Sequence, residues 1–291
     1  MAEISAQAVK ALREQTGAGM MDCKKVLADA GGDPKRALEL LRERGLAKAG
    51  KREGRATSEG VIAIVAEGAR GGIVELGCET DFVARTDDFN QLAADLARTV
   101  ARDAQAASAA ALQQARIDGE TVADRITGAI AKLGENIVVK RAAQVGAPPG
   151  GLVGGYLHAG GKLGVLVALG GPVADPGLPA LAKDVAMHVA AADPSPVAVD
   201  RDGVPKALLD SERAIFRKQA EQTGKPPAVI EKIVEGRVGK FLSEICLIEQ
   251  PFVKDPDRTV GDLLREAGGR LGGAVTVVSF QRFKVGGTSE A

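Results

Sequence analysis

Apolar residues recur at helical spacing through the first 45 residues. Side chains one turn apart predict short helices over residues 6–15, 20–30 and 34–45. Ser5 is suited to cap the first helix, and Asp33 followed by Pro34 is typical of the start of the third. Glycines separate the three stretches. The pattern therefore predicts a small N-terminal helical bundle whose third helix ends at Gly45.

The pattern then changes to runs that are typical of strands. Residues 61–77 hold two apolar stretches around a glycine-rich turn, which predicts an antiparallel hairpin. Helical spacing returns over residues 89–100 and 122–133, and residues 137–145 predict another strand. Residues 101–119 are rich in Ala and Gln and weakly patterned, so a helix and a mobile connection both stay open there.

The same order of elements occurs a second time. Residues 152–158 and 163–169 predict strands around a glycine turn, and a proline-containing loop then leads to a helix over residues 181–189. Strand, glycine turn, strand, loop and helix thus follow one another from Gly60 and again from Gly151. We interpret this order as a weak internal duplication that gives two α+β subdomains with antiparallel sheets.

The C-terminal part contains a predicted helical hairpin. Residues 206–248 carry two helical stretches on either side of a turn with the sequence GKPP, and the pair resembles an antiparallel coil. A short helix after Thr259 and a strand over residues 275–285 return the chain to a sheet. The glycine-rich end, residues 286–291, is expected to fray.

The chain is long enough for two or three domains. We expect an N-terminal bundle at 1–46, a basic linker at 47–58, one α+β subdomain at 59–146 and a second at 147–291 that includes the hairpin. The linker assignment depends on the stretch KAGKREGR at residues 48–55, which is basic, contains glycine and has no apolar periodicity. The expected fold class is α+β.

The charge balance argues against a nucleic-acid-binding protein. The chain has 38 basic and 38 acidic residues, and 7 Phe, 1 Tyr and no Trp leave few surfaces for base stacking. No apolar run approaches the roughly 20 residues that span a bilayer, and no secretory signal is visible. The 3 cysteines are too widely spaced for a disulfide framework. We therefore expect a cytoplasmic protein without membrane or direct nucleic-acid contacts.

The motifs of nucleotide and metal sites are missing from the sequence. No P-loop pattern occurs, and cysteines and histidines show no paired ligand spacing. Cys78 would need His158 or His188 as a base to act as a nucleophile. His188 lies on an apolar helix face, which favours a core histidine, whereas His158 is as readily a contact residue as an ordinary surface one. We expect no cofactor, metal or turnover chemistry, with a Cys78-dependent hydrolase as the alternative.

One stretch combines an aromatic ring and a carboxylate on a predicted loop. Residues 78–85 read CETDFVAR between a predicted strand and a predicted helix. In a contact with another molecule, the Phe82 ring supplies buried area and the Asp81 carboxylate accepts a hydrogen bond or repels a phosphate. A lone Phe is more often packed in a core, so both interpretations stay open on this stretch alone.

Four stretches, in this order, resemble the bacterial elongation factor Ts family. They are TGAGMMDCK at residues 16–24, TDFVAR at 80–85, AMHVA at 186–190, and VEGR at 234–237 with EQPFV at 249–253. The resemblance covers nearly the whole chain, and the first two stretches together are highly specific.

The resemblance implies an exchange factor for the translational GTPase elongation factor Tu. Such a factor displaces Mg²⁺ from the GTPase and promotes GDP release so that GTP can bind. The bundle would resemble a ubiquitin-associated domain and dock on the GTPase domain. The implied partner contacts are Thr80, Asp81, Phe82 and Val83 in the segment that dislodges Mg²⁺, with Phe82 as a wedge between two helices, and Met20, Met21, Arg85 and His158. For Met20 and Met21, filling the bundle core is the alternative.

The role of the hairpin stays open. It either contacts the GTPase or a second copy of this chain, in which case the C-terminal subdomain can contribute to a homodimer, or it is a protrusion with a solvated charged face. The charged residues of that face are Glu212, Arg213, Arg217, Lys218 and Glu221. A ubiquitin-binding adaptor is another alternative, but it explains the N-terminal bundle only.

Overall fold

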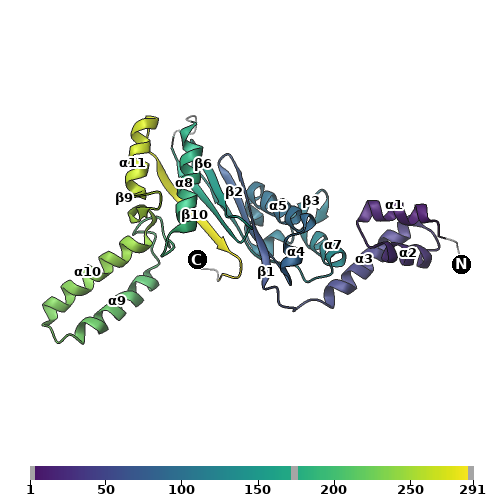
Figure 1. Ribbon diagram of the computed structural model, residues 1–291, viewed down its shortest axis with the longest axis horizontal. Coiled ribbons are helices and arrows are strands. Elements are labelled where there is room, and N and C mark those ends of the chain that lie inside the picture. The colour runs from purple at the N-terminus through teal and green to yellow at the C-terminus, as the bar shows by residue number, and fades with distance from the viewer. Residues whose placement is uncertain (1–3, 172–175, 288–291) are drawn as a thin grey trace.

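The computed structural model describes residues 4–171 and 176–287 and has an α+β fold (Figure 1). Its centre is two three-stranded antiparallel sheets, β1-β2-β5 and β6-β7-β10. Their strands are Glu59–Glu67, Arg70–Cys78 and Val138–Gly146, then Leu152–Leu157, Leu163–Gly170 and Thr276–Lys284. In each sheet a later strand pairs with the second strand of a hairpin, so the structure shows the same arrangement twice, as the predicted duplication requires.

The two sheets face each other, and a helix covers the outer face of each. Apolar side chains such as Ile73 and Leu166 form the core between the sheets. Helix α5 (Asp87–Arg102) covers the first sheet, and α8 (Gly177–Ala191) covers the second. Gly72 permits the close approach of α5, because a Cβ there would lie 2.1 Å from the carbonyl oxygen of Ala97. The resulting order is helix, sheet, sheet, helix.

The N-terminal bundle consists of α1 (Ala6–Thr16), α2 (Met20–Asp29) and α3 (Pro34–Gly50). Ser5 and Asp33 cap their helices through side-chain oxygens, as predicted. The prediction that α3 ends at Gly45 was wrong. Gly45 packs against α7 (Val122–Leu133), where its Cβ position lies 3.6 Å from the Ala131 Cβ, and this contact favours continuation of the helix to Gly50.

This extension of α3 changes the expected linker. Residues 47–50 are helical, residues 51–54 form a turn, and β1 begins at Glu59. Arg42 of α3 pairs with Asp124 of α7 at 2.8 Å, so the bundle is attached to the first subdomain by a side-by-side helix contact as well as by the chain. The four-part division of the chain at residues 46, 58 and 146 stays a prediction.

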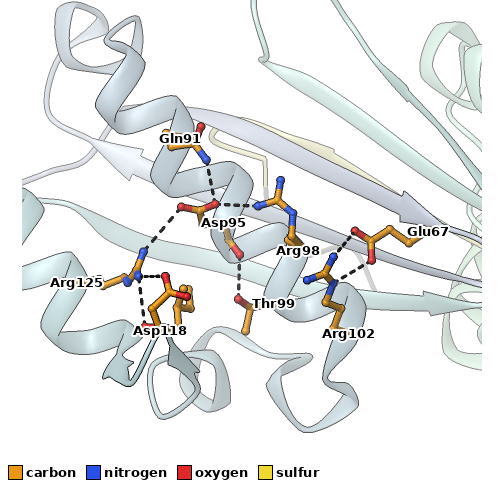
Figure 2. A network of polar contacts seen from close by, with 9 residues as sticks. Glu67, Gln91, Asp95, Arg98, Thr99, Arg102, Asp118 and Arg125 are labelled. Carbon is orange, nitrogen blue, oxygen red and sulfur yellow. Dashed lines mark hydrogen bonds and ion pairs between the residues drawn. The ribbon is translucent and has the colours of Figure 1, made fainter.

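The Ala-rich stretch is a series of short ordered elements. These are a 3-10 turn at Ala104–Ala106, α6 (Ala109–Leu112), β3 (Arg116–Ile117) and β4 (Glu120–Thr121). Asp118 and Gly119 have φ angles of 53° and 86° and form the two-residue turn between β3 and β4. Figure 2 shows how Arg125 of α7 joins this hairpin to α5: its guanidinium lies 2.6 Å from Asp118 and 3.8 Å from Asp95.

The C-terminal hairpin projects from the second subdomain (Figure 1). Its helices are α9 (Lys206–Glu221) and α10 (Pro227–Ile245), which share a buried apolar seam. Two of the charged residues of the expected solvated face form ion pairs between the helices: Arg213 with Glu235 at 3.5 Å and Arg217 with Glu231 at 2.8 Å. The chain then returns through a 3-10 turn (Leu247–Glu249), β8 (Pro251–Phe252), β9 (Asp255–Thr259) and α11 (Val260–Leu271).

Two further expectations concern the C-terminal end of the chain and its membrane contacts. The predicted fraying from residue 286 was wrong for Gly286, whose N–H donates to the Glu75 carboxylate at 2.9 Å. Residues 288–291, and Pro172 of the predicted loop before α8, lie outside the described residues. Within the two described ranges, no helix combines the length and the apolar character needed to cross a bilayer.

Candidate partner-binding site

Phe82 is the exposed aromatic of this chain. Its side chain is 81% exposed, whereas the other six Phe are buried or half-buried. The interpretation that Phe82 packs inward is therefore wrong, and the ring is accessible, as a contact with another molecule requires. The whole benzyl group is therefore accessible to another molecule, although a single exposed apolar side chain does not by itself mark an interface.

The predicted loop around Phe82 is a single helical turn. Helix α4 (Asp81–Ala84) begins directly after β2, and the Thr80 side-chain oxygen accepts the N–H of Val83 at 3.4 Å. Val83 and Ala84 are buried against the apolar core of the first subdomain. Because successive residues of a helical turn are about 100° apart, this inward packing directs Phe82 outward. The expectation of an irregular loop was wrong, since Thr80 supplies a helix cap.

Asp81 and Arg85 form an ion pair across this turn. The Arg85 guanidinium lies 2.8 Å from the Asp81 carboxylate, and both side chains are exposed, Arg85 at 79%. An exposed pair at this spacing contributes at most about 0.5 kcal/mol. A partner can therefore separate the two charges at little energetic cost.

The junction between β2 and α4 is held by hydrogen bonds to Glu135 and Asn136, which no pattern in the sequence marked. One oxygen of the Glu135 carboxylate accepts the backbone N–H groups of Glu79 and Thr80, both at 3.0 Å. The other oxygen accepts the Thr80 hydroxyl at 2.5 Å. In return, the Glu79 carboxylate accepts the backbone N–H of Asn136 at 2.6 Å. No local motif marks Glu135, which lies 55 residues after Thr80.

His158 lies beside the same end of the sheets. It begins the turn between β6 and β7, is exposed, and contacts the Tyr156 hydroxyl through Nδ1 at 2.9 Å. The turn docks on β1, because Gly161 accepts the N–H of Ile62 at 2.7 Å and the Lys162 ammonium reaches Glu59 at 2.5 Å. Glu59 is the pairing partner of Cys78 in the β1–β2 hairpin. The structure therefore places the His158 turn next to the junction that leads to Phe82.

Met20 and Met21 belong to a separate surface. They begin α2 and are 56% and 76% exposed, so the alternative that they fill the bundle core was wrong. Figure 1 places α2 beyond α7, away from α4. A groove of about 410 Å³ lies along the contact between the bundle and α7, but Met20 and Met21 do not line it. The structure thus places the His158 turn and the start of α4 at the same end of the sheets and leaves the two methionines apart.

The buried histidine and cysteine have structural surroundings. His188 is 1% exposed, and its ring bonds to Gln250 through Nε2 at 2.9 Å and to the N–H of Val253 through Nδ1 at 3.3 Å, as expected of a core histidine. Cys78 is fully buried, and this burial, with the nearby Glu135 charge, raises the pKa of its thiol to about 11. Among the described residues, no group of three or more His, Cys, Asp or Glu is arranged to hold a metal ion.

Comparison with known proteins shows the family of this chain. A family model described as "Elongation factor TS" matches residues 79–287, which begin at the junction that Glu135 holds. The chain belongs to the elongation factor Ts family. It is 47% identical over 285 residues to elongation factor Ts of Thioalkalivibrio sulfidiphilus, covering 97% of this chain and 92% of that protein.

Two more relatives are similar over nearly the whole chain. Elongation factor Ts of Desulfovibrio desulfuricans is 44% identical over 292 residues, with 98% of this chain and 99% of the relative covered. The protein of the same name from Clostridium acetobutylicum is 43% identical over 286 residues, with 97% and 92% covered. Membership of the elongation factor Ts family makes this chain a translation elongation factor.

Proposed function

We propose that the chain is the nucleotide exchange factor of the GTPase elongation factor Tu. It binds the GTPase, displaces Mg²⁺ and promotes release of GDP so that GTP can bind. The observation that supports this proposal most directly is the exposed Phe82 ring, mounted on a capped helical turn at the end of β2 in a member of the elongation factor Ts family. The proposal assigns no catalytic reaction to this chain. We expect the chain to act in the cytoplasm.

The exposed ring acts as a wedge. Elongation factor Tu holds GDP through a phosphate-binding loop and Mg²⁺, and an aromatic side chain inserted between two of its helices shifts that loop without touching the nucleotide. Aromatic anchors at the centre of an interface contribute roughly 2–4 kcal/mol. A coupling of about 1.4 kcal/mol already changes an equilibrium tenfold, so one ring is sufficient for a large effect on GDP affinity.

The other residues of the surface extend the contact. Thr80 and Val83 hold the helical turn, and Asp81 exchanges its bond with Arg85 for a contact beside the wedge. His158 approaches the partner from the neighbouring turn, where Tyr156 orients its ring. Met20 and Met21 dock the N-terminal bundle on the GTPase domain, as their exposure on α2 permits.

The hairpin of α9 and α10 stays a candidate contact to elongation factor Tu or to a second copy of this chain. Light scattering on the full chain and on a variant that lacks residues 206–245 separates the two. An unchanged oligomeric state after the deletion removes the hairpin as a dimer contact.

Release of labelled GDP from elongation factor Tu, with and without the chain, tests the proposed function. We expect the chain to accelerate release, and we expect GDP to dissociate the complex, because a factor that weakens GDP binding is weakened by GDP to the same extent. A release rate that does not depend on the chain's concentration would refute the proposal.

A further inference from the structure

The Glu135 carboxylate contacts the two residues that precede the helical turn carrying Phe82. Its two carboxylate oxygens accept three hydrogen bonds from two consecutive residues, Glu79 and Thr80, at the point where β2 ends and α4 begins. A carboxylate accepts hydrogen bonds and donates none, so it satisfies backbone and hydroxyl donors together. Such charge-assisted bonds are among the strong ones in proteins.

The bond to the Thr80 hydroxyl determines how the helix is capped. A hydroxyl has one proton, and here it points to Glu135 at 2.5 Å. The lone pairs of the same oxygen are then free to accept the N–H of Val83 at 3.4 Å, which begins α4. Glu135 thus acts on Phe82 through Thr80, without lying next to the ring in sequence.

Neighbouring contacts hold Glu135 itself. Asn136, which is 5% exposed, donates its backbone N–H to Glu79 at 2.6 Å and its side-chain amide to the Arg55 carbonyl at 2.9 Å. The two segments therefore exchange hydrogen bonds in both directions. This lock leaves the β2–α4 junction little freedom to rearrange in the free protein.

We propose that Glu135 is a positioning residue for nucleotide exchange, which keeps the Phe82 ring in the orientation that enters the partner. The inference rests on the proposed exchange function. Small displacements of a working group cost large factors in rate even when the contacts that hold two molecules together are kept. Glu135 therefore affects how fast bound elongation factor Tu loses GDP more than how tightly the two proteins associate.

Glu135→Gln is the sharpest variant, because it keeps the shape of the side chain. A Gln oxygen can still accept the two backbone N–H groups, but its NH₂ group faces the Thr80 hydroxyl and donates to it. The hydroxyl proton must then turn away, and the hydroxyl oxygen has to accept both this NH₂ group and the N–H of Val83. Thr80→Val, which removes the same hydroxyl and leaves Glu135 in place, is the second variant in case Glu135→Gln does not fold.

Asp262→Ala is the matched control. Asp262 accepts the backbone N–H of Thr259 at 3.0 Å and its hydroxyl at 2.8 Å, which is the same kind of carboxylate–threonine contact at the start of α11. Figure 1 shows α11 on the opposite side of the two sheets from α4. Asp262→Ala therefore shows what the loss of such a contact does to the stability of the chain when the Phe82 turn is unchanged.

The experiment measures stimulated release of labelled GDP from elongation factor Tu over a range of concentrations of the full chain. We expect Glu135→Gln to lower the maximal rate roughly tenfold and to change the half-saturating concentration by less than about twofold, whereas Asp262→Ala leaves both at wild-type values. In the Phe82→Ala background, Glu135→Gln should cause no additional loss, because its effect passes through the ring.

Three results would overturn the inference. A wild-type maximal rate for Glu135→Gln or, if that variant does not fold, for Thr80→Val removes the positioning role. A full additional loss in the Phe82→Ala background shows that Glu135 acts independently of the ring. If the wild-type chain itself does not stimulate release, the proposed function fails and this inference fails with it. Either of the first two results, in contrast, overturns the positioning role of Glu135 and leaves the proposed function standing.

Discussion

At the end of β2, side chains four residues apart have opposite surroundings. Cys78 is fully buried, whereas Phe82 is 81% exposed. Because burial raises the pKa of the Cys78 thiol to about 11, the thiol is protonated at neutral pH and is a poor nucleophile. The accessible residue here is therefore the aromatic one, and a buried, protonated thiol does not favour the alternative of a Cys78-dependent hydrolase.

Cysteine labelling tests this difference. Cys23, Cys78 and Cys246 are all buried, so we expect iodoacetamide at pH 7 to label the native chain far more slowly than the chain in urea. Mass spectrometry of the labelled peptides gives the rate for each thiol. Fast labelling of Cys78 in the native chain would contradict the described surroundings.

His188 makes stability depend on pH. Burial lowers the pKa of its imidazole below the ordinary value of 6.5, against a smaller opposing effect of the Gln250 hydrogen bond. The unfolded chain therefore binds more protons near pH 6 than the folded chain, so stability is present above pH 6.5 and falls as the pH drops below it. Urea unfolding at pH 7.5 and 5.5 should show this loss, and His188→Gln should reduce it.

The control for this experiment is His158→Gln, which removes an exposed imidazole. A pH dependence of stability that is the same in the wild type and in His188→Gln would show that another group is responsible.

The residues of the site differ in how well the sequence could reveal them. Phe82, Asp81 and His158 could be named because they lie in or near recognisable stretches, although only the structure showed that Phe82 faces outward. Glu135 could not be named, because its hydrogen bonds to Thr80 connect positions 55 residues apart. Sequence spacing reports neighbours on one helix or strand, whereas this contact depends on how α7 and β2 come together.

At the scale of elements, long periodic stretches were predictable and short ones were not. Helices α5 and α7 and the β1–β2 hairpin follow the predicted ranges within a few residues. The β3–β4 hairpin was missed although Asp118-Gly119 is a strong turn signal, because each of its strands has only two residues. Helix α3 was predicted too short because its continuation depends on packing against α7, which is a tertiary contact.

Close contact between α5 and the first sheet predicts a large effect at Gly72. A Cβ there would lie 2.1 Å from the Ala97 carbonyl oxygen and 2.5 Å from the Ala101 nitrogen, both backbone atoms that cannot move aside easily. We expect Gly72→Ala to destabilise the chain by about 3 kcal/mol or more in urea unfolding. The control is Gly128→Ala within α7, which meets no atom within 4 Å and should be neutral or stabilising by about 0.5–1 kcal/mol.

Equal stabilities of Gly72→Ala and Gly128→Ala would contradict the close helix-to-sheet packing. It is this packing that holds the end of β2, from which α4 and Phe82 project.

At the scale of the whole molecule, a buried ion pair within the first sheet also contacts a strand of the second. The Glu75 carboxylate of β2 contacts the Arg141 guanidinium of β5 at 2.6 Å, and side-chain exposures are 5% and 12%. The same guanidinium lies 4.4 Å from the centre of the Phe283 ring and donates to the Lys284 carbonyl at 2.8 Å. Strand β10 of the second sheet is thereby attached to the first sheet. The order of elements in the two halves does not predict this contact.

Removal of the cation from this pair should therefore destabilise the whole chain. Arg141→Met leaves the Glu75 carboxylate buried without its partner, and we expect a loss of about 3 kcal/mol in urea unfolding. The double variant Glu75→Gln/Arg141→Met should recover part of this loss, since it removes the uncompensated charge. A double variant less stable than Arg141→Met would contradict the assignment of a buried ion pair.

The measurement that tests the central claim most directly is stopped-flow release of labelled GDP from elongation factor Tu with the wild-type chain and with Phe82→Ala. Since the ring is 81% exposed, its removal should leave the fold and urea stability unchanged. We predict that Phe82→Ala slows stimulated release at least roughly tenfold, whereas Val278→Ala, which truncates another exposed apolar side chain, leaves it unchanged. Release at the wild-type rate with Phe82→Ala would contradict the claim that this ring opens the partner's nucleotide site.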